Sequence, residues 1–144
     1  MKILLQRVKK SSVTVSNQVV SEIGKGLLLL VGIGKDETPA DLDRLAQKIL
    51  NFRIFEDENG KMNLNIQQVS GEILSVSQFT LYADTKKGNR PGFDQAAKPD
   101  LAKELWQEFN QKLRLGGITV KEGIFAAKME VELVNEGPVT FWLE

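Results

Sequence analysis

The stretch SQFTLY, from Ser77 to Tyr82, brings hydroxyls, an amide and a phenol together. Thr80 is a potential nucleophile, but a hydroxyl needs an adjacent base to attack an ester. The chain contains no histidine and no cysteine, which excludes Ser-His-Asp and Cys-His mechanisms. A lysine could activate Thr80, although none lies within SQFTL. The stretch therefore predicts either a substrate-positioning site or a structural strand, since strands favour Thr, Phe and Tyr.

A second unusual stretch is NEGPVT, from Asn135 to Thr140. It lies between KMEVELV and VTFWLE, which alternate in the way that strands do. Proline has no N–H and fixes φ, so Gly137-Pro138 interrupts the hydrogen-bond ladder. The simplest interpretation is a hairpin turn. The alternative is that the backbone break itself has a function.

A third stretch, DTKKGNRPGFDQAAK (residues 84–98), shows no helical or strand periodicity and predicts an exposed loop. Loops longer than ~12 residues in compact domains are often functional. Lys86, Lys87 and Arg90 lie beside glycines in this loop. Alone they indicate a solvated loop, but next to a polar strand end they could hold a phosphate backbone.

Short alternating or apolar segments predict the strands that position these stretches. They are KILLQRV, SVTVS, QVVSEI, GLLLLVGI, FRIF, GEILSVSQFTLYA, ITVKEG, AKMEVELV and VTFWLE. In the long strand GEILSVSQFTLYA, Ser77 and Phe79 would face one side, and Gln78 and Thr80 the other. The run from Leu27 to Val31 is apolar on both faces, which predicts a central strand. Asn59-Gly60 predicts a turn with a short returning segment.

Two amphipathic segments predict helices. Thr38 is a suitable N-cap, followed by Pro39 at the first helical position and an apolar stripe. The second helix begins near Pro99 and ends at Gly116-Gly117. We expect a strand-rich α+β fold with both helices packed on one face of the sheet.

Length and composition limit the functional classes. A chain of 144 residues predicts a single domain, residues 1–144. No apolar run approaches the roughly 20 residues of a membrane span, and the start does not resemble a signal peptide, so we expect a cytoplasmic protein without a membrane partner. Basic and acidic residues number 19 each, so no overall positive field indicates nucleic acid, and an RNA partner would need a local patch.

The chain resembles the D-aminoacyl-tRNA deacylase family over essentially its whole length. The resemblance rests on QRV, KGLLLLVGI, RIFEDENGKMNLN, VSQFTLYADT, RPGF and LVNEGPVTFWL, which occur in the family's order. SQFTL and N-x-GPVT are the family's two signature motifs. Family proteins usually carry Asp where Glu136 stands and Ser where Gly92 stands, so a side-chain contact from position 92 is in doubt.

The resemblance implies hydrolysis of the ester between a D-amino acid and the tRNA 3′ end. Gly137 and Pro138 would form a cis peptide that rejects L-residues and reaches the partner's active site in a homodimer, with Arg7 supporting it. A filter that reads only Cα handedness would also let glycine through. No metal or other cofactor is implied. Free D-amino acid and reusable tRNA are the products expected of such quality control in translation.

The same resemblance assigns roles around SQFTL. Ser77, Gln78, Phe79 and Thr80 would form the catalytic strand, with Phe79 backbone groups holding the substrate's α-amino group. The terminal ribose 2′-OH would assist the reaction, and N–H groups near Phe79 and Thr80 would stabilise the oxyanion.

The substrate-binding residues implied by the resemblance are Phe125 and Met129, which would border the terminal adenine. Without the family, both would be interpreted as core residues. Two alternatives to the family's function also stay open. One is a conventional esterase with Thr80 as nucleophile, and the other is an RNA-binding module without catalysis.

Overall fold

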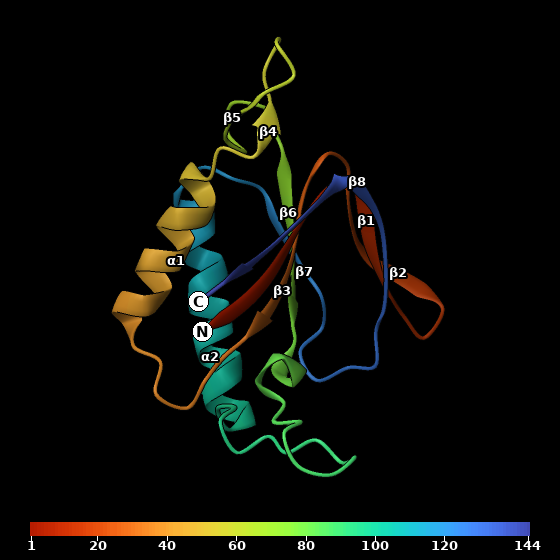
Figure 1. Cartoon of the computed structure of the whole chain (residues 1–144). Helices are drawn as coiled ribbons and strands as arrows, with labels where there is room; N and C mark the ends of the chain where they lie inside the picture. The colour runs from red at the N-terminus through yellow and green to blue at the C-terminus, as the bar shows by residue number, and fades with distance from the viewer.

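The computed structural model describes residues 1–144 and consists of a curved six-stranded sheet, a small hairpin and two helices (Figure 1). The strands of the large sheet are β1 (Lys2–Val15), β2 (Gln18–Ile23), β3 (Gly26–Gly32), β6 (Glu72–Ser77), β7 (Val120–Glu122) and β8 (Glu130–Leu143). The hairpin is formed by β4 (Phe55–Glu56) and β5 (Met62–Leu64). Both helices pack on one face of the sheet, so the predicted α+β architecture is confirmed.

Strand β1 organises the sheet because it pairs with three other strands. Its first half is antiparallel to β3, its second half to β2, and its whole length to β8. Strand β3 continues in parallel to β6, and β6 in parallel to β7. The predicted central position of the apolar run Leu27 to Val31 is confirmed, since β3 has a strand on each side.

The helices begin and end where the sequence predicts. Helix α1 (Pro39–Asn51) starts after Thr38, whose N–H and hydroxyl donate to Asp41 Oδ2 at 3.1 and 2.6 Å, so the Asp41 side chain satisfies the N–H of the N-cap residue. Helix α2 (Pro99–Leu115) starts with proline and ends at Gly116. Apolar side chains of both helices pack against Leu27, Leu29 and Ile73 of the sheet and form the larger core.

The other face of the sheet holds a second, smaller core. Leu28 and Leu74 alternate with the residues of the larger core along their strands and point the opposite way. The sheet curls around this core until β2 approaches β7, where Ser21 Oγ donates to the carbonyl of Glu122 and Lys121 Nζ donates to that of Glu22. The sheet is thus nearly closed.

Three sequence predictions of strand boundaries are wrong. KILLQRV and SVTVS form one strand, β1, because the polar residues between them keep pairing with β8. Most of AKMEVELV and VTFWLE likewise belongs to one strand, β8, which begins at Glu130 and ends at Leu143. The predicted strand GEILSVSQFTLYA ends at Ser77 and is followed by a 3₁₀ helix, η1 (Phe79–Tyr82). None of the helices is long and apolar enough to cross a membrane.

Candidate functional site

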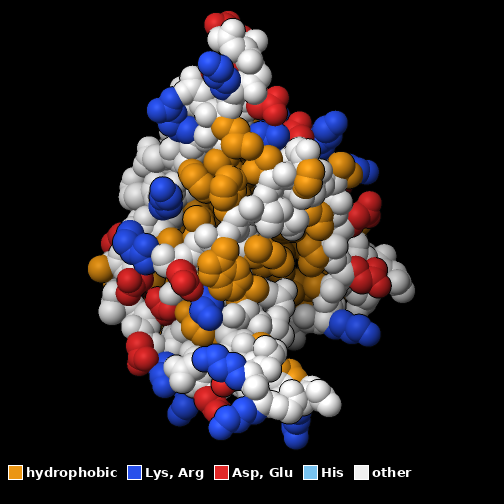
Figure 2. Space-filling model, viewed as in Figure 1, with side chains coloured by type: hydrophobic (Ala, Val, Ile, Leu, Met, Phe, Trp, Pro, Cys, Tyr) orange, Lys and Arg blue, Asp and Glu red, His pale blue; other side chains and the backbone are white.

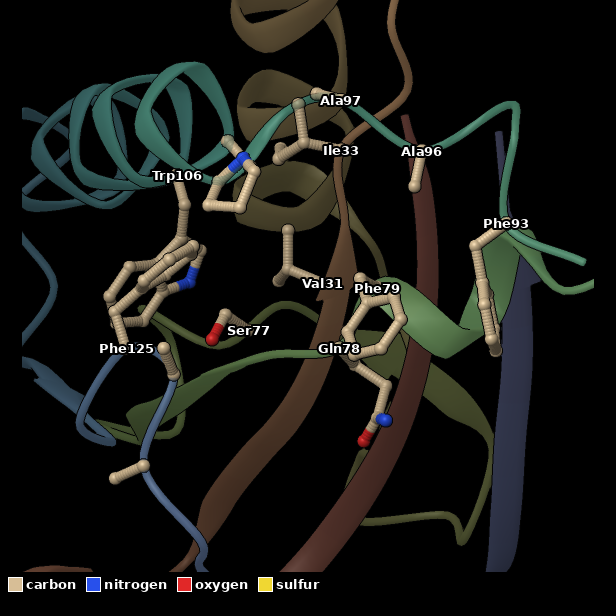
Figure 3. A pocket seen from close by; sticks show the side chains of 14 residues that line it. Val31, Ile33, Ser77, Gln78, Phe79, Phe93, Ala96, Ala97, Trp106 and Phe125 are labelled. Atoms are coloured by element: carbon tan, nitrogen blue, oxygen red, sulfur yellow. The ribbon is translucent and has the colours of Figure 1, made fainter.

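A cavity of about 460 Å³ lies between the end of β6, the segment 93–97 and the start of α2 (Figure 3). Its walls are mostly apolar, and no charged side chain lines it. The lining residues whose side chains are labelled are Val31, Ile33, Ser77, Gln78, Phe79, Phe93, Ala96, Ala97, Trp106 and Phe125. Such a space suits a flat, uncharged group, with Ser77 and Gln78 as the polar exceptions.

The SQFTL motif forms one side of this cavity because the chain changes conformation within it. The N–H of Gln78 donates to the carbonyl of Val31 at 2.7 Å, which extends the pairing of β6 with β3 by one residue. The chain then turns into η1, whose Leu81 N–H donates to Gln78 O at 3.3 Å. The predicted alternation of Ser77 and Phe79 against Gln78 and Thr80 is therefore wrong beyond the strand end.

The hydroxyl of Thr80 has an amide as its side-chain hydrogen-bond partner, and no acid or base. Its Oγ1 accepts a hydrogen bond from Gln78 Nε2 at 2.5 Å. An amide N–H only donates, so it cannot take a proton from the hydroxyl. The cavity next to it contains no acid or base. What this end of η1 offers is backbone N–H groups, since the first ones of a helix have no partner inside it.

Aromatic rings form the mouth and one wall of the cavity (Figure 3). The ring of Phe79 is 56% exposed and packs edge-on against Phe93, with centroids 4.9 Å apart. On the wall, Trp106 lies 6.0 Å from Phe125 between ring centroids. Trp106 is fixed by a 2.9 Å hydrogen bond from its Nε1 to buried Ser75 Oγ. The cavity therefore has a rigid wall and a mouth formed partly by an exposed ring.

Tyr82 anchors the far end of η1. Its hydroxyl donates to Glu37 Oε1 at 2.7 Å, which ties η1 to the segment before α1. Burial, the hydrogen bond to Glu37 and the nearby negative charge together raise the pKa of Tyr82 above its ordinary value. A Cβ on Gly34 would lie 2.6 Å from the Tyr82 hydroxyl oxygen, so only glycine fits there. The hydrogen bond between Tyr82 and Glu37 holds η1 in place beside the cavity.

The NEGPVT stretch is a bulge within β8 and not a hairpin turn, which was the simplest interpretation of its sequence. Gln6 pairs with Thr140 and Val8 pairs with Asn135, so the residues between Asn135 and Thr140 stand opposite Arg7 alone. Asn135 holds the base of the bulge: its Nδ2 donates to the carbonyls of Arg7 at 2.9 Å and Val139 at 3.0 Å. Its Oδ1 accepts from the Thr140 hydroxyl at 3.3 Å. The ladder continues on both sides.

The tip of the bulge is exposed while its support is buried. The Gly137–Pro138 peptide bond is cis, which confirms what the resemblance implied, and Gly137 has φ +123°. Both residues are exposed. Arg7, only 3% exposed, lies beneath them, donating to Ile54 O at 2.7 Å and to Glu136 O at 3.4 Å. The protein thus presents a short, supported segment of backbone to the outside.

Within one chain, the bulge and the cavity are far apart. Arg7, which stands opposite the bulge, pairs with Leu27 of β3, whereas Ser77, which lines the cavity, pairs with Val31 of the same strand. The bulge and the cavity are therefore separated by roughly 13 Å along the strand direction. Going from β8 through β1 and β3 to β6 adds about 14 Å across the sheet. Arg7 contacts Ile54 and Glu56 beside the small hairpin, at the opposite end of the molecule from η1 (Figure 1). The predicted site residues thus form two groups.

Phe125 and Met129, predicted to act together, lie in different surroundings. Phe125 lines the cavity. Met129 is not among the lining residues and packs against the smaller core. Its Sδ would be 2.7 Å from a Cβ on Gly123. Met129 therefore supports the chain that leads into the cavity wall.

Several residues of the site had no functional prediction of their own. In the sequence, Trp106 belongs to the apolar stripe of α2, and this pattern predicts only a core residue. Phe93 lay in a segment without periodicity, and Asn135 could be found only through the N-x-GPVT spacing. No group of three or more Asp, Glu, His or Cys side chains that could hold a metal ion is present.

The segment 84–98, named here the basic loop, borders the cavity. Phe93, Ala96 and Ala97 belong to its second half and line the cavity. The second half is held to β3 and its continuation by the pairing of Gly34 with Ala96 and by the N–H of Ala97 donating to Ile33 O at 3.0 Å. Lys and Arg side chains gather at this end of the molecule in Figure 2.

A protein-family model described as D-Tyr-tRNA(Tyr) deacylase matches residues 4–144. The chain is 57% identical over 144 residues to D-aminoacyl-tRNA deacylase of Staphylococcus haemolyticus (strain JCSC1435), covering 100% of this chain and 95% of that protein. It is 56% identical over 144 residues to D-aminoacyl-tRNA deacylase of Exiguobacterium sp. (strain ATCC BAA-1283 / AT1b), covering 100% and 98%.

Two solved structures are also similar. One is described as c-Myc DNA Unwinding Element Binding Protein, with a TM-score of 0.93 and 41% identity over 100% of this chain and 98% of that one. The other is described as a probable eukaryotic D-amino acid tRNA deacylase, with a TM-score of 0.86 over 99% and 97% of the chains. At 19% identity, the second similarity bears on the fold alone.

Proposed function

The chain belongs to the D-aminoacyl-tRNA deacylase family, and we propose that it hydrolyses the ester between a D-amino acid, or glycine, and the tRNA 3′ end. As a member, it is a hydrolase that acts on ester bonds. The observation that carries the proposal is the match to the family over residues 4–144, signature motifs included. The products are free D-amino acid and reusable tRNA, which serves translation quality control in the cytoplasm.

The active site is composed of two subunits in this proposal. The Gly137–Pro138 bulge is exposed and stands at the opposite end of the sheet from Thr80. One chain cannot bring both signature motifs to the same substrate without rebuilding its sheet. A homodimer in which each bulge enters the partner's cavity mouth uses both motifs and leaves the fold unchanged.

The bulge acts as a filter for chirality. A side-chain pocket would select amino acids by size and polarity, whereas backbone carbonyls close to Cα reject a Cβ of the wrong hand. Such a filter must be rigid, and the hydrogen bonds of Asn135 and Arg7 provide that support. The enzyme therefore accepts many D-residues and excludes L-residues.

The chemistry depends on positioning. Ser77, Gln78 and Phe79 hold the ester beside η1, and the N–H groups near Phe79 and Thr80 stabilise the oxyanion. The terminal ribose 2′-OH assists proton transfer, because no acidic or basic side chain lines the cavity. The apolar cavity beside Phe125 accommodates the terminal adenine, and Met129 supports that wall from behind.

Two other functions would use the same surface. A conventional esterase would attack with Thr80 and leave an acyl-Thr80 intermediate, but the hydroxyl has only an amide beside it. A nucleic-acid-binding module would bind without releasing an amino acid, and the 41% identical structure is described as a protein that binds a DNA element. The equal numbers of acidic and basic residues do not favour binding as the whole function.

The test is deacylation of D-tyrosyl-tRNA and L-tyrosyl-tRNA prepared on the same tRNA. We expect release of D-tyrosine at least 100-fold faster than that of L-tyrosine (~2.7 kcal/mol). Equal release of both would contradict the filter, and binding without release would support the module.

A further inference from the structure

The tip of the basic loop is a closed and exposed segment. The N–H of Asp84 donates to Gly92 O at 2.8 Å, and the N–H of Gly92 donates back to Asp84 O at 3.0 Å. This pair closes the neck and leaves residues 85–91 exposed. Asp84 Oδ1 accepts from the N–H of Lys86 at 2.9 Å and so shapes the first turn of the tip.

The basic side chains of this loop have no acidic partners. Lys86, Lys87, Arg90 and Lys98 form no ion pair, as is true of most Lys and Arg residues of this chain, so all four charges are free to meet a partner. The loop also contains Asp84 and Asp94, so its positive excess is small and concentrated at the tip. In Figure 2, this end of the molecule carries a group of Lys and Arg side chains. An unpaired group of cations on a closed loop is suited to an anionic partner.

The position of the tip relates these cations to the substrate. Arg90 precedes Phe93 by three residues, so the chain between them spans at most ~10 Å. Phe93 lines the cavity and packs against Phe79 at its mouth. A nucleotide whose base lies in the cavity would therefore have its 5′ phosphate, and the phosphates before it, within reach of the tip.

We propose that the tip of the basic loop, through Lys86, Lys87 and Arg90, binds the phosphate backbone of the tRNA acceptor end. This rests on the proposed function. The cations bind phosphates without reading sequence, which suits an enzyme that must act on many tRNAs. A surface of this kind makes affinity depend on salt, because each neutralised phosphate releases counterions.

The test compares two double variants with the wild type. Lys87→Ala/Arg90→Ala removes charge from the tip. Lys25→Ala/Lys61→Ala removes the same charge from exposed positions at the other end of the sheet. Each protein is assayed on D-tyrosyl-tRNA and on D-tyrosyl-adenosine, which has no phosphate, between about 50 and 200 mM salt.

We expect the tip variant to lose about tenfold or more in kcat/KM on D-tyrosyl-tRNA, through KM. The slope of log kcat/KM against log salt concentration should become shallower by ~1.4–1.8, the value for two lost phosphate contacts. Its activity on D-tyrosyl-adenosine should equal that of the wild type, which also shows that it is folded. The Lys25/Lys61 variant should match the wild type on both substrates.

Equal losses on both substrates would overturn the proposal, because the loop would then be shaping the cavity. No loss on the tRNA substrate would also overturn it. Failure of the wild type to cleave either substrate would contradict the proposed function. In that case, binding of uncharged tRNA, measured by fluorescence anisotropy, still tests the proposed phosphate-binding role of the tip. Weaker binding by the tip variant alone would support this role, and equal binding by all three proteins would contradict it.

Discussion

Thr80 shows how a residue type can suggest one mechanism and its surroundings another. Its hydroxyl accepts from the Gln78 amide and has no base beside it. Activation of a hydroxyl nucleophile needs a base within hydrogen-bond reach. We therefore propose that Thr80 shapes this end of η1 and that the backbone N–H groups there contact the reacting ester.

Thr80→Ala should keep substantial activity. We expect kcat on D-tyrosyl-tRNA to fall by no more than about tenfold, which corresponds to ~1.4 kcal/mol. Thr119→Ala, an exposed threonine between α2 and β7, is the matched control and should have no effect. A trapped acyl-Thr80 adduct would show that Thr80 is the nucleophile, and complete inactivation would contradict the expected minor role of Thr80.

The absence of a side-chain base leads to a second prediction about the substrate. A tRNA whose terminal nucleotide is 2′-deoxy should be deacylated far more slowly, by about 100-fold or more, the lower range of acid–base catalysis. Its binding, measured by competition against the normal substrate, should change little. Normal rates on the deoxy substrate would mean that the protein supplies the proton relay.

The bulge of β8 leaves the backbone of Gly137 and Pro138 exposed. Gly137 has φ +123°, and a Cβ there would lie 2.7 Å from Val139 Cγ2 and 3.3 Å from Arg7 Nη2. Gly137→Ala should therefore displace the bulge, lower the free energy of unfolding by about 1 kcal/mol or more, and reduce deacylation of D-tyrosyl-tRNA by at least tenfold.

Gly24→Ala is the control for that change, because Gly24 has no atom within 4 Å of an added Cβ and no positive φ. It should alter neither the midpoint of urea unfolding nor the deacylation rate. Wild-type activity and discrimination in Gly137→Ala would show that the bulge does not contact the substrate.

Elements with local signals could be predicted, whereas those set by distant partners could not. Thr38 and Pro39 specify the start of α1 through caps that involve neighbouring residues. The end of β6 at Ser77 has no such signal, because SQFTLY has high strand propensity, and the 3₁₀ turn depends on Tyr82 reaching Glu37. The bulge likewise depends on Arg7 and Asn135, which are distant in sequence.

The site residues follow the same division. SQFTL and N-x-GPVT could be identified because a family resemblance gave them meaning, while the residues alone left structural interpretations open. Trp106 and Phe93, which line the cavity, could not be distinguished from core or loop residues in the sequence. Met129 packs on the smaller core, and its expected role beside the terminal adenine stays a prediction.

The separation of the two signature motifs within one chain predicts a dimer. Light scattering should give about twice the 16.1 kDa mass of the chain.

Mixing two inactive variants provides the sharper test of a site shared between subunits. Gly137→Ala damages the bulge, and Ala96→Trp fills the cavity that Ala96 lines. Each variant alone should have little activity, but a heterodimer should regain one working site, formed by the intact cavity of one chain and the intact bulge of the other.

No recovery in the mixture, with heterodimers verified by mass spectrometry, would mean that bulge and cavity of the same chain cooperate. An active species with the mass of a single chain would exclude the shared site altogether. Mixing the wild type with itself under the same conditions provides the control for losses during exchange.

We propose that the enzyme rejects L-residues by its backbone and does not recognise a D-side chain. Glycine has no Cβ for the filter to reject, and an apolar pocket distinguishes a methyl group by only ~1–3 kcal/mol. The direct measurement is deacylation of one tRNA charged with D-alanine, L-alanine or glycine. We expect D-alanyl-tRNA and glycyl-tRNA to be cleaved while L-alanyl-tRNA survives. Glycyl-tRNA surviving as well as L-alanyl-tRNA would contradict this proposal, because the site would then require a D-side chain.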